Sequence, residues 1–171
     1  MTGIAAEVNM NECACTRNRY PDQLAVTPLV PVQLSAETPA VWCKLEFLNP
    51  SGSTKDGIAR YILEKAFGAG RLKRDDTVIE ASSGYTSIAM ALTCAQLGLH
   101  FVAVLPDGVS NQRVLMIRAY GCGTHLTPGE ARIRGCIAGS EKLASETGAF
   151  LPRQFANPAN VEAHQLGPQD P

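Results

Sequence analysis

Short apolar runs of strand length alternate with helix-forming segments through most of this sequence. Residues 77–81 and 101–105 are two such runs, and each leads through a polar loop or turn into a helical segment. The helical segment 88–97 is apolar on nearly all sides, which predicts that it is buried on most of its faces. This alternation, repeated about four times, predicts an α/β fold of three layers: a parallel sheet with helices on both faces, joined by right-handed crossovers.

The rest of the chain fits around these segments. Residues 1–23 are polar and hold no period, so we expect a loose N-terminal arm. Two prolines in the extended piece 27–34 favour a sheet edge, and alternation over 40–47 predicts a strand. Further elements are predicted as helices over 55–69, 110–120 and 130–147 and as a strand near 124–126.

Two polar loops follow predicted strands and lead into predicted helices. The first spans residues 49–54, and the second spans residues 82–87. Ligands of parallel α/β sheets bind beyond the carboxyl ends of the strands, where such loops lie. We therefore expect the two loops to converge on one site.

Lys55 stands where the first loop becomes a helix. Ser53 fits a helix N-cap, and Asp56 lies three residues later, where a carboxylate can reach back to the N–H group of the cap. Lys55 is then expected in the first helical turn, where the positive end of the helix dipole favours the neutral amine that a Schiff base requires. The competing interpretation is a solvated lysine at a helix start. A Walker phosphate loop is excluded because Gly52 is not adjacent to Lys55.

Charge and hydropathy restrict the class of partner. The 15 Lys and Arg residues are matched by 16 Asp and Glu residues, whereas a nucleic-acid-binding protein usually carries a basic surplus. No run approaches the roughly 18 apolar residues of a membrane span, and the N-terminus lacks a signal pattern. We therefore expect a cytoplasmic protein without a nucleic-acid or membrane partner.

Cysteine and histidine spacing predicts no metal site. Of the six cysteines, four lie in apolar or helical segments, and we expect them to be buried thiols rather than a disulfide framework. The pair Cys13-Ala14-Cys15 has no second pair of ligands, and no two histidines are spaced as a ligand pair.

With both loops in view, the chain resembles the fold-type II pyridoxal-phosphate enzymes, in particular the cysteine synthase and cystathionine beta-synthase family. The matching motifs run in family order from about residue 27 to the C-terminus. They are Thr27-Pro28-Leu29, Lys44-Leu45-Glu46, Asn49-Pro50-x-Gly52-Ser53-x-Lys55-Asp56, Glu80-x-Ser82-Ser83-Gly84-x-Thr86, Arg113-Val114-Leu115-x-Ile117-Arg118-x-Tyr120-Gly121 and Gln154-Phe155-x-Asn157-Pro158-x-Asn160-x-x-x-His164.

The resemblance implies a role for each site residue. Lys55 corresponds to the catalytic Schiff-base lysine and binds the cofactor, pyridoxal 5'-phosphate. Tyr85 stands where the family usually has an asparagine that touches the ring hydroxyl of the cofactor. The residues implied to hold the carboxylate of a small amino-acid substrate are Ser82, Ser83, Gly84, Thr86 and Gln154.

The implied activity is a beta-replacement of amino-acid biosynthesis, in which O-acetylserine and sulfide give cysteine and acetate. The family habit implies a homodimer. The resemblance further divides the chain into an arm (1–23), an edge segment of the larger domain (24–39), a small α/β domain with the lysine (40–148) and the start of a truncated larger domain (149–171).

Three departures from the family pattern keep an alternative open. Tyr85 replaces the usual asparagine, Gly57 replaces the arginine that usually follows Lys-Asp, and family members run on for nearly as long again. The alternative is a truncated, non-catalytic remnant or a binding module of the same family. A nucleotide-binding oxidoreductase is a third hypothesis, but no Gly-x-Gly-x-x-Gly follows a strand.

Overall fold

The computed structural model describes residues 27–166, so the predicted arm 1–23 lies outside the described part of the chain. A 3-10 turn, η2 (Glu46–Leu48), precedes the first α-helix, and a second, η3 (Gly129–Ala131), precedes the fourth. The strands are β1 (Leu29–Val32), β2 (Val41–Lys44), β3 (Thr77–Ala81), β4 (His100–Pro106) and β5 (Gly123–Thr127). The α-helices are α1 (Lys55–Gly68), α2 (Tyr85–Leu97), α3 (Asn111–Ala119), α4 (Arg132–Thr147) and α5 (Pro158–Leu166).

The predicted parallel sheet is present and has the strand order β3-β4-β5. Thr77 of β3 lies opposite His100 of β4, and Val102 of β4 lies opposite Gly123 of β5. Phe150 extends the β3 edge, where its N–H donates to the carbonyl of Thr77 at 2.8 Å. The carboxyl ends of all three strands therefore lie at one end of the sheet.

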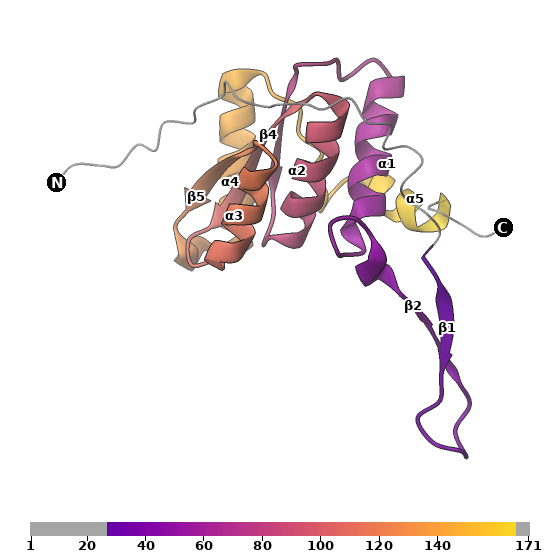
Figure 1. Cartoon of the computed structure of the whole chain (residues 1–171). Coiled ribbons are helices and arrows are strands. Elements are labelled where there is room, and N and C mark those ends of the chain that lie inside the picture. The colour runs from indigo at the N-terminus through magenta and orange to yellow at the C-terminus, as the bar shows by residue number, and fades with distance from the viewer. Residues whose placement is uncertain (1–26, 167–171) are drawn as a thin grey trace.

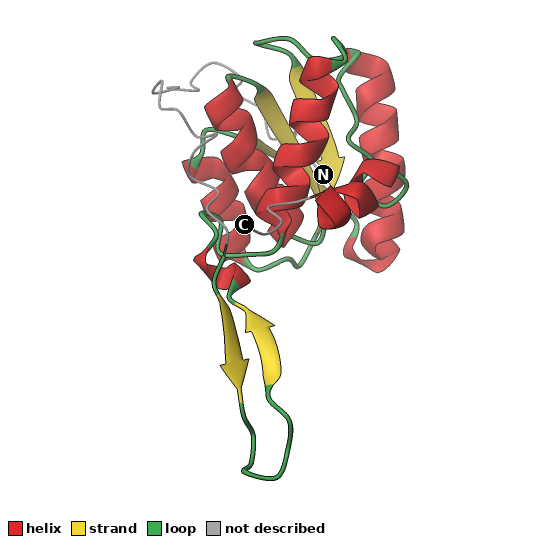
Figure 2. Cartoon of the chain, turned by 90° about the vertical axis from the view of Figure 1, so that its right-hand side faces the viewer, coloured by secondary structure: helices red, strands yellow, loops and turns green. Residues whose placement is uncertain are grey.

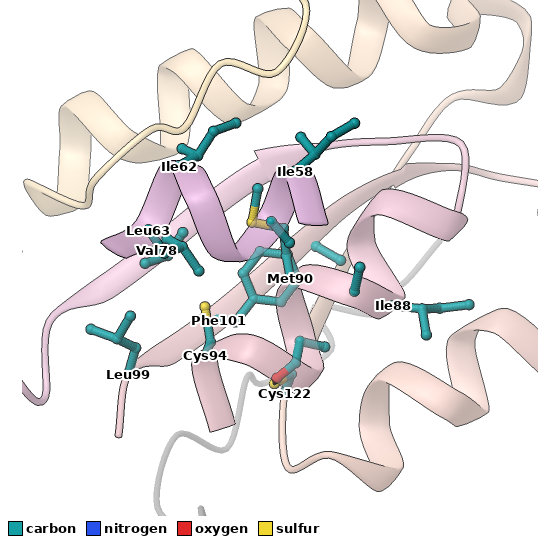
Figure 3. Packing of buried hydrophobic residues seen from close by; sticks show 14 of the residues in the cluster. Ile58, Ile62, Leu63, Val78, Ile88, Met90, Cys94, Leu99, Phe101 and Cys122 are labelled. Atoms are coloured by element: carbon teal, nitrogen blue, oxygen red, sulfur yellow. The ribbon is translucent and has the colours of Figure 1, made fainter. Parts of the chain in front are cut away.

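Helices cover both faces of this sheet (Figure 1). On one face α2 packs against β3 and β4, with α1 and α3 on either side of α2, while α4 packs against all three strands on the other face. Buried apolar side chains form two clusters, one on each face of the sheet, because side chains alternate between the two faces along each strand. Val78 and Phe101 face the α1–α2 layer, as Figure 3 shows, whereas Ile79 and Val102 face α4. The predicted three-layer α/β arrangement is confirmed.

Strands β1 and β2 form a separate antiparallel hairpin that projects from the body of the molecule (Figures 1 and 2). The expectation that a strand over 40–47 feeds the parallel sheet is therefore wrong. The strand ends at Lys44, because the chain winds into η2 and passes directly to the Lys55 loop. The hairpin leaves apolar side chains in solvent, with Trp42 63% exposed and Leu29 57% exposed.

Two helices differ from expectation. Helix α2 starts at Tyr85, three residues earlier than predicted, because Gly84 takes φ = 142° and turns the chain straight into the helix. Helix α5 was not predicted, although Asn157-Pro158 is a recognisable start signal. The Asn157 side chain accepts the N–H of Ala159 at 3.0 Å, and proline suits a first helical position.

The remaining sequence expectations concern cysteines and membranes. Cys94, Cys122 and Cys136 are buried, as predicted, whereas Cys43 in the projecting hairpin is only partly buried. Cys13 and Cys15 fall outside the described residues. Over residues 27–166, no helix has both the length and the apolar character needed to cross a bilayer.

Candidate functional site

The two polar loops lie at the same end of the molecule. Helices α1 and α2 pack against each other, and both begin at the end where β3 and β4 terminate (Figure 1). Helix α3 also begins there, because it follows β4. The sheet thus gathers three helix N-termini at its carboxyl edge, which is where ligands of such folds bind.

The loop before Lys55 is held by a network of polar side chains. Asn49 donates through Nδ2 to Glu46 Oε2 at 2.7 Å and to the carbonyl of Ser53 at 2.9 Å. Glu46 accepts a further bond from the Thr27 hydroxyl at 2.7 Å. These bonds tie both ends of the loop to the base of the hairpin, so the position of Lys55 does not depend on the helix alone.

Lys55 is the first residue of α1, as predicted, but the cap differs from expectation. Thr54 occupies the N-cap position without a side-chain bond, and the Ser53 hydroxyl accepts the N–H of Lys55 at 3.2 Å. The carboxylate of Asp56 reaches back past the cap to Ser51, accepting its N–H at 3.1 Å and its hydroxyl at 2.6 Å. The loop is tighter than a simple capping box, because Asp56 closes a ring of six residues.

Asp56 is fully buried directly beside Lys55 in the sequence. Burial raises the pKa of this carboxyl above its ordinary value, and the hydrogen bond from the Ser51 hydroxyl is the largest opposing effect. Its second oxygen, Oδ1, has no hydrogen-bond partner among the described residues. Asp56 thus stabilises the bend at a desolvation cost.

The second loop is organised by Ser82. Its buried hydroxyl accepts the N–H of Gly84 at 2.9 Å and the N–H of Ser87 at 3.3 Å. Within residues 27–166, the N–H groups of Ser83, Tyr85 and Thr86 have no protein acceptor, as expected for the start of a helix. Backbone donors of this kind, backed by the helix dipole, bind carboxylates.

The predicted carboxylate-binding residues therefore differ in exposure. Ser83 is exposed and Tyr85 is 55% exposed, whereas Ser82, Gly84 and Thr86 are buried. The Ser82 hydroxyl is occupied within the loop, so in this conformation it shapes the loop rather than offering a donor.

The side chain of Gln154 packs in space against the end of β3, where the second loop begins. Its side-chain amide donates to the carbonyl of Ala81 at 2.6 Å, and its backbone carbonyl accepts a hydrogen bond from the side-chain amide of Asn160 at 2.8 Å. Gln154 is buried. In this arrangement the amide stabilises the strand end that presents Ser82.

Two residues of this region stand in the matching motifs, but no role for them was predicted from the sequence. Glu80 is a buried acid in the otherwise apolar run Val-Ile-Glu-Ala, and burial raises its pKa to about 7. An acid within such a buried apolar strand is a signal that the sequence alone displays. Arg113 donates from Nη1 to the carbonyl of Ser83 at 3.2 Å, and its guanidinium lies 4.8 Å from the centre of the Tyr85 ring. No spacing rule connects residues 83 and 113, which only the fold brings together.

No group of three potential metal ligands occurs within the described residues. The arrangement offers instead one amine at the start of α1 and a set of free N–H groups at the start of α2. Those are the parts needed to bind an aldehyde covalently and a carboxylate by hydrogen bonds.

Comparison with known proteins gives consistent results. The family model described as "Pyridoxal-phosphate dependent enzyme" matches residues 21–167. A cysteine synthase from Staphylococcus aureus (strain Mu50 / ATCC 700699) is 42% identical over 147 residues, which cover 84% of this chain and 47% of that protein. The chain thus spans about half the length of the curated relatives it matches.

Solved structures agree in fold. The crystal structure of O-ureido-L-serine synthase matches with a TM-score of 0.79 and 39% identity, over 85% of this chain and 46% of that one. An O-acetylserine dependent cystathionine beta-synthase from Helicobacter pylori matches with a TM-score of 0.78 and 34% identity, over 84% and 48% of the respective chains. The two proteins are named for different reactions, so the likeness shows the family and not the reaction.

Proposed function

Because the chain belongs to the family of pyridoxal-phosphate-dependent enzymes, we propose that it carries the lysine and the carboxylate loop of a cysteine synthase-like beta-replacement enzyme. The proposed reaction converts O-acetylserine and sulfide to cysteine and acetate. Its main support is that Lys55 opens α1 at the same end of the molecule where α2 presents unpaired N–H groups.

The residues present fit pyridoxal phosphate in two respects. Lys55 directly follows a loop that hydrogen bonds of Asn49 and Asp56 hold in place, so the backbone that carries its side chain has a fixed position. The ring of Tyr85 is exposed one residue after Gly84, at the position of the family's asparagine, where it can lie against the cofactor but cannot offer the amide of that asparagine. When bound, the cofactor supplies an electron sink for the negative charge that develops at the substrate α-carbon.

The proposed roles of the chain's own groups follow from their positions. The N–H groups of Ser83, Tyr85 and Thr86 orient the substrate carboxylate, with Ser82 and Gly84 setting the conformation of the loop. With the cofactor bound, the Nζ atom of Lys55 would be the base that takes the α-proton of the substrate. Gln154 reaches the same carboxylate if its side-chain amide gives up its hydrogen bond to the Ala81 carbonyl and donates to the substrate instead.

Covalent attachment tests the proposal. The chain is mixed with pyridoxal phosphate, reduced with borohydride and digested, and the modified lysine is located by mass spectrometry. We expect a visible absorbance band before reduction and modification at Lys55, with Lys55→Ala losing both. The matched control is Lys44→Ala, at the end of β2, which should retain the band. Modification spread over several surface lysines would refute the proposed role of Lys55.

A second candidate is a binding module of the same family that holds the cofactor without turnover. It is supported by Tyr85 and Gly57, which replace the usual asparagine and arginine of the family, and by the exposed apolar side chains of the β1–β2 hairpin. An assay for cysteine formation separates the two, because a binding module should be labelled at Lys55 yet give no sulfide-dependent product. We also propose, from the habit of the family, that the chain forms a homodimer and that segment 24–39 belongs to a larger domain.

A further inference from the structure

The start of α3 brings one arginine against the carboxylate loop. Arg113 follows β4 by one short turn, and its side chain reaches back to the loop after β3. Its Nη1 donates to the carbonyl of Ser83 at 3.2 Å, and its Cζ lies 4.8 Å from the centre of the Tyr85 ring. The guanidinium therefore makes a hydrogen bond and a cation–π contact with two residues that flank Gly84.

Gly84 is the point of closest approach between the loop and Arg113. A Cβ atom on Gly84 would lie 2.4 Å from Cδ and 2.9 Å from Nε of Arg113. Gly84 also has φ = 142°, a backbone conformation that residues with a side chain rarely adopt. Three consecutive loop residues thus pack against a single arginine side chain.

This packing has two consequences for an anion at the start of α2. The bond to Arg113 holds the Ser83 carbonyl and with it the Ser83–Gly84 peptide, whose N–H donates to the Ser82 hydroxyl. This peptide lies between those that carry the N–H groups of Ser83 and Tyr85, which have no acceptor among the described residues, so fixing it limits their orientation. The guanidinium also places a full positive charge beside those groups, which adds to the helix dipole. A lysine would supply the charge without the planar group that stacks on Tyr85.

We propose that Arg113 is a positioning residue that holds Ser83, Gly84 and Tyr85 in the carboxylate-binding conformation and strengthens anion binding there. The identity of the anion, the carboxylate of an amino-acid substrate, rests on the proposed function. The dependence of anion affinity on Arg113 requires neither Lys55 nor the cofactor.

The test measures carboxylate binding by the cofactor-free chain. Amide signals of Ser83, Tyr85 and Thr86 are followed by NMR in the 15N-labelled protein while sodium acetate, and separately L-serine, is added. We expect Arg113→Gln to lower the affinity for both ligands by roughly three- to tenfold, and Arg113→Lys to recover part of that loss. The matched control is Arg118→Gln on the same helix, whose side chain bonds to Thr124 Oγ1 at 3.2 Å instead. It should leave the affinity unchanged.

Two further variants separate the possible outcomes. Tyr85→Leu removes the stacked ring and should weaken L-serine less than Arg113→Gln does, whereas Tyr85→Phe should bind as the parent chain does. Equal losses in Arg113→Gln and Arg118→Gln would overturn the proposal, as would an Arg113→Gln variant of unchanged affinity. If Lys55→Ala abolishes cofactor attachment but keeps Arg113-dependent acetate binding, both proposals stand. If the cofactor attaches elsewhere, only the proposed function fails.

Discussion

The carboxylate of Glu80 accepts a hydrogen bond from the backbone N–H of Gln154 at 3.0 Å, across 74 residues of sequence. Its other oxygen accepts the N–H of Ala81 at 2.9 Å. Glu80 thus joins the end of β3 to the segment that leads into α5, and within residues 27–166 it has no cationic partner. Burial raises its pKa from an ordinary 4.5 to about 7, although the N–H groups of Gln154, Ala81 and Arg153 lower it in part.

This raised pKa makes stability depend on pH in a defined direction. The folded chain binds the Glu80 proton more tightly than the unfolded chain does, so the associated stability is fully present below about pH 4.5. It is lost as the pH rises through about 7, by an amount on the order of 3 kcal/mol. Urea unfolding at pH 5, 6, 7 and 8 measures the slope.

The matched variant for this prediction is Glu80→Gln, which cannot ionise. Because its amide nitrogen would face a backbone donor, the variant should be less stable than the parent chain at pH 5. Its stability should change less than that of the parent between pH 5 and 8. Parallel pH profiles for the two proteins would show that Glu80 is not the titrating group.

Two glycines near the site should respond in opposite ways to alanine. Gly84→Ala forces a Cβ into Arg113 at a φ of 142°, and should lower the free energy of unfolding by about 1–3 kcal/mol. Gly57→Ala places a methyl group inside α1 with nothing within 4 Å, and should raise the free energy by up to about 1 kcal/mol. Chemical denaturation of both variants gives the comparison, and a neutral Gly84→Ala would contradict the tight approach.

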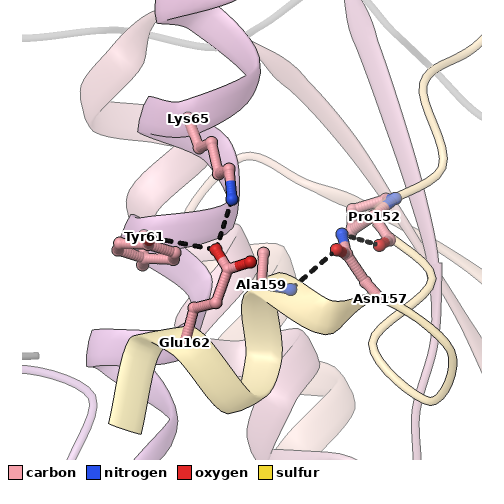
Figure 4. Close-up of polar contacts among 6 residues, drawn as sticks. All are labelled: Tyr61, Lys65, Pro152, Asn157, Ala159 and Glu162. Carbon is pink, nitrogen blue, oxygen red and sulfur yellow. Dashed lines mark hydrogen bonds and ion pairs between the residues drawn. The ribbon is translucent and has the colours of Figure 1, made fainter. Parts of the chain in front are cut away.

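Helix α5 should depend more on its small buried side chains than on its ion pair. Ala159 and Ala163 belong to the core shared with α1, whereas Glu162 pairs at the surface with Lys65 and accepts the Tyr61 hydroxyl at 3.1 Å (Figure 4). We expect Glu162→Gln to cost less than about 1 kcal/mol, and Ala163→Asp to cost more than about 2 kcal/mol. Hydrogen exchange of the α5 amides reports each variant, and an equal effect of the two would argue against docking by apolar contact.

The sequence predicted those parts of the fold that depend on local pattern. The apolar runs at 77–81 and 101–105 became β3 and β4 because strands buried on both faces are continuous in hydrophobicity. The start of α1 at Lys55 followed from the polar loop before it. The pairing of residues 41–44 with β1 in a separate hairpin was not predictable in this way, because alternation does not tell which strand a segment pairs with.

The same distinction holds within the candidate site. The two loops could be expected at one sheet edge, because parallel strands end together. The hydrogen bond of Arg113 to Ser83 joins residues 30 positions apart, and the hydrogen bond between Glu80 and Gln154 joins residues 74 positions apart. Such contacts depend on how α3 and the segment before α5 fold back, which no local pattern encodes.

Whether the starts of α1 and α2 form one binding site can be decided by amide NMR of the covalently labelled chain. Pyridoxal phosphate is first attached to Lys55 by borohydride reduction, and spectra are compared before and after labelling. If the two helix starts share one site, the amide signals of Ser83, Tyr85 and Thr86 should shift on labelling, as should those of the loop 49–54. Shifts confined to residues near Lys55, with the second loop unchanged, would contradict a shared site.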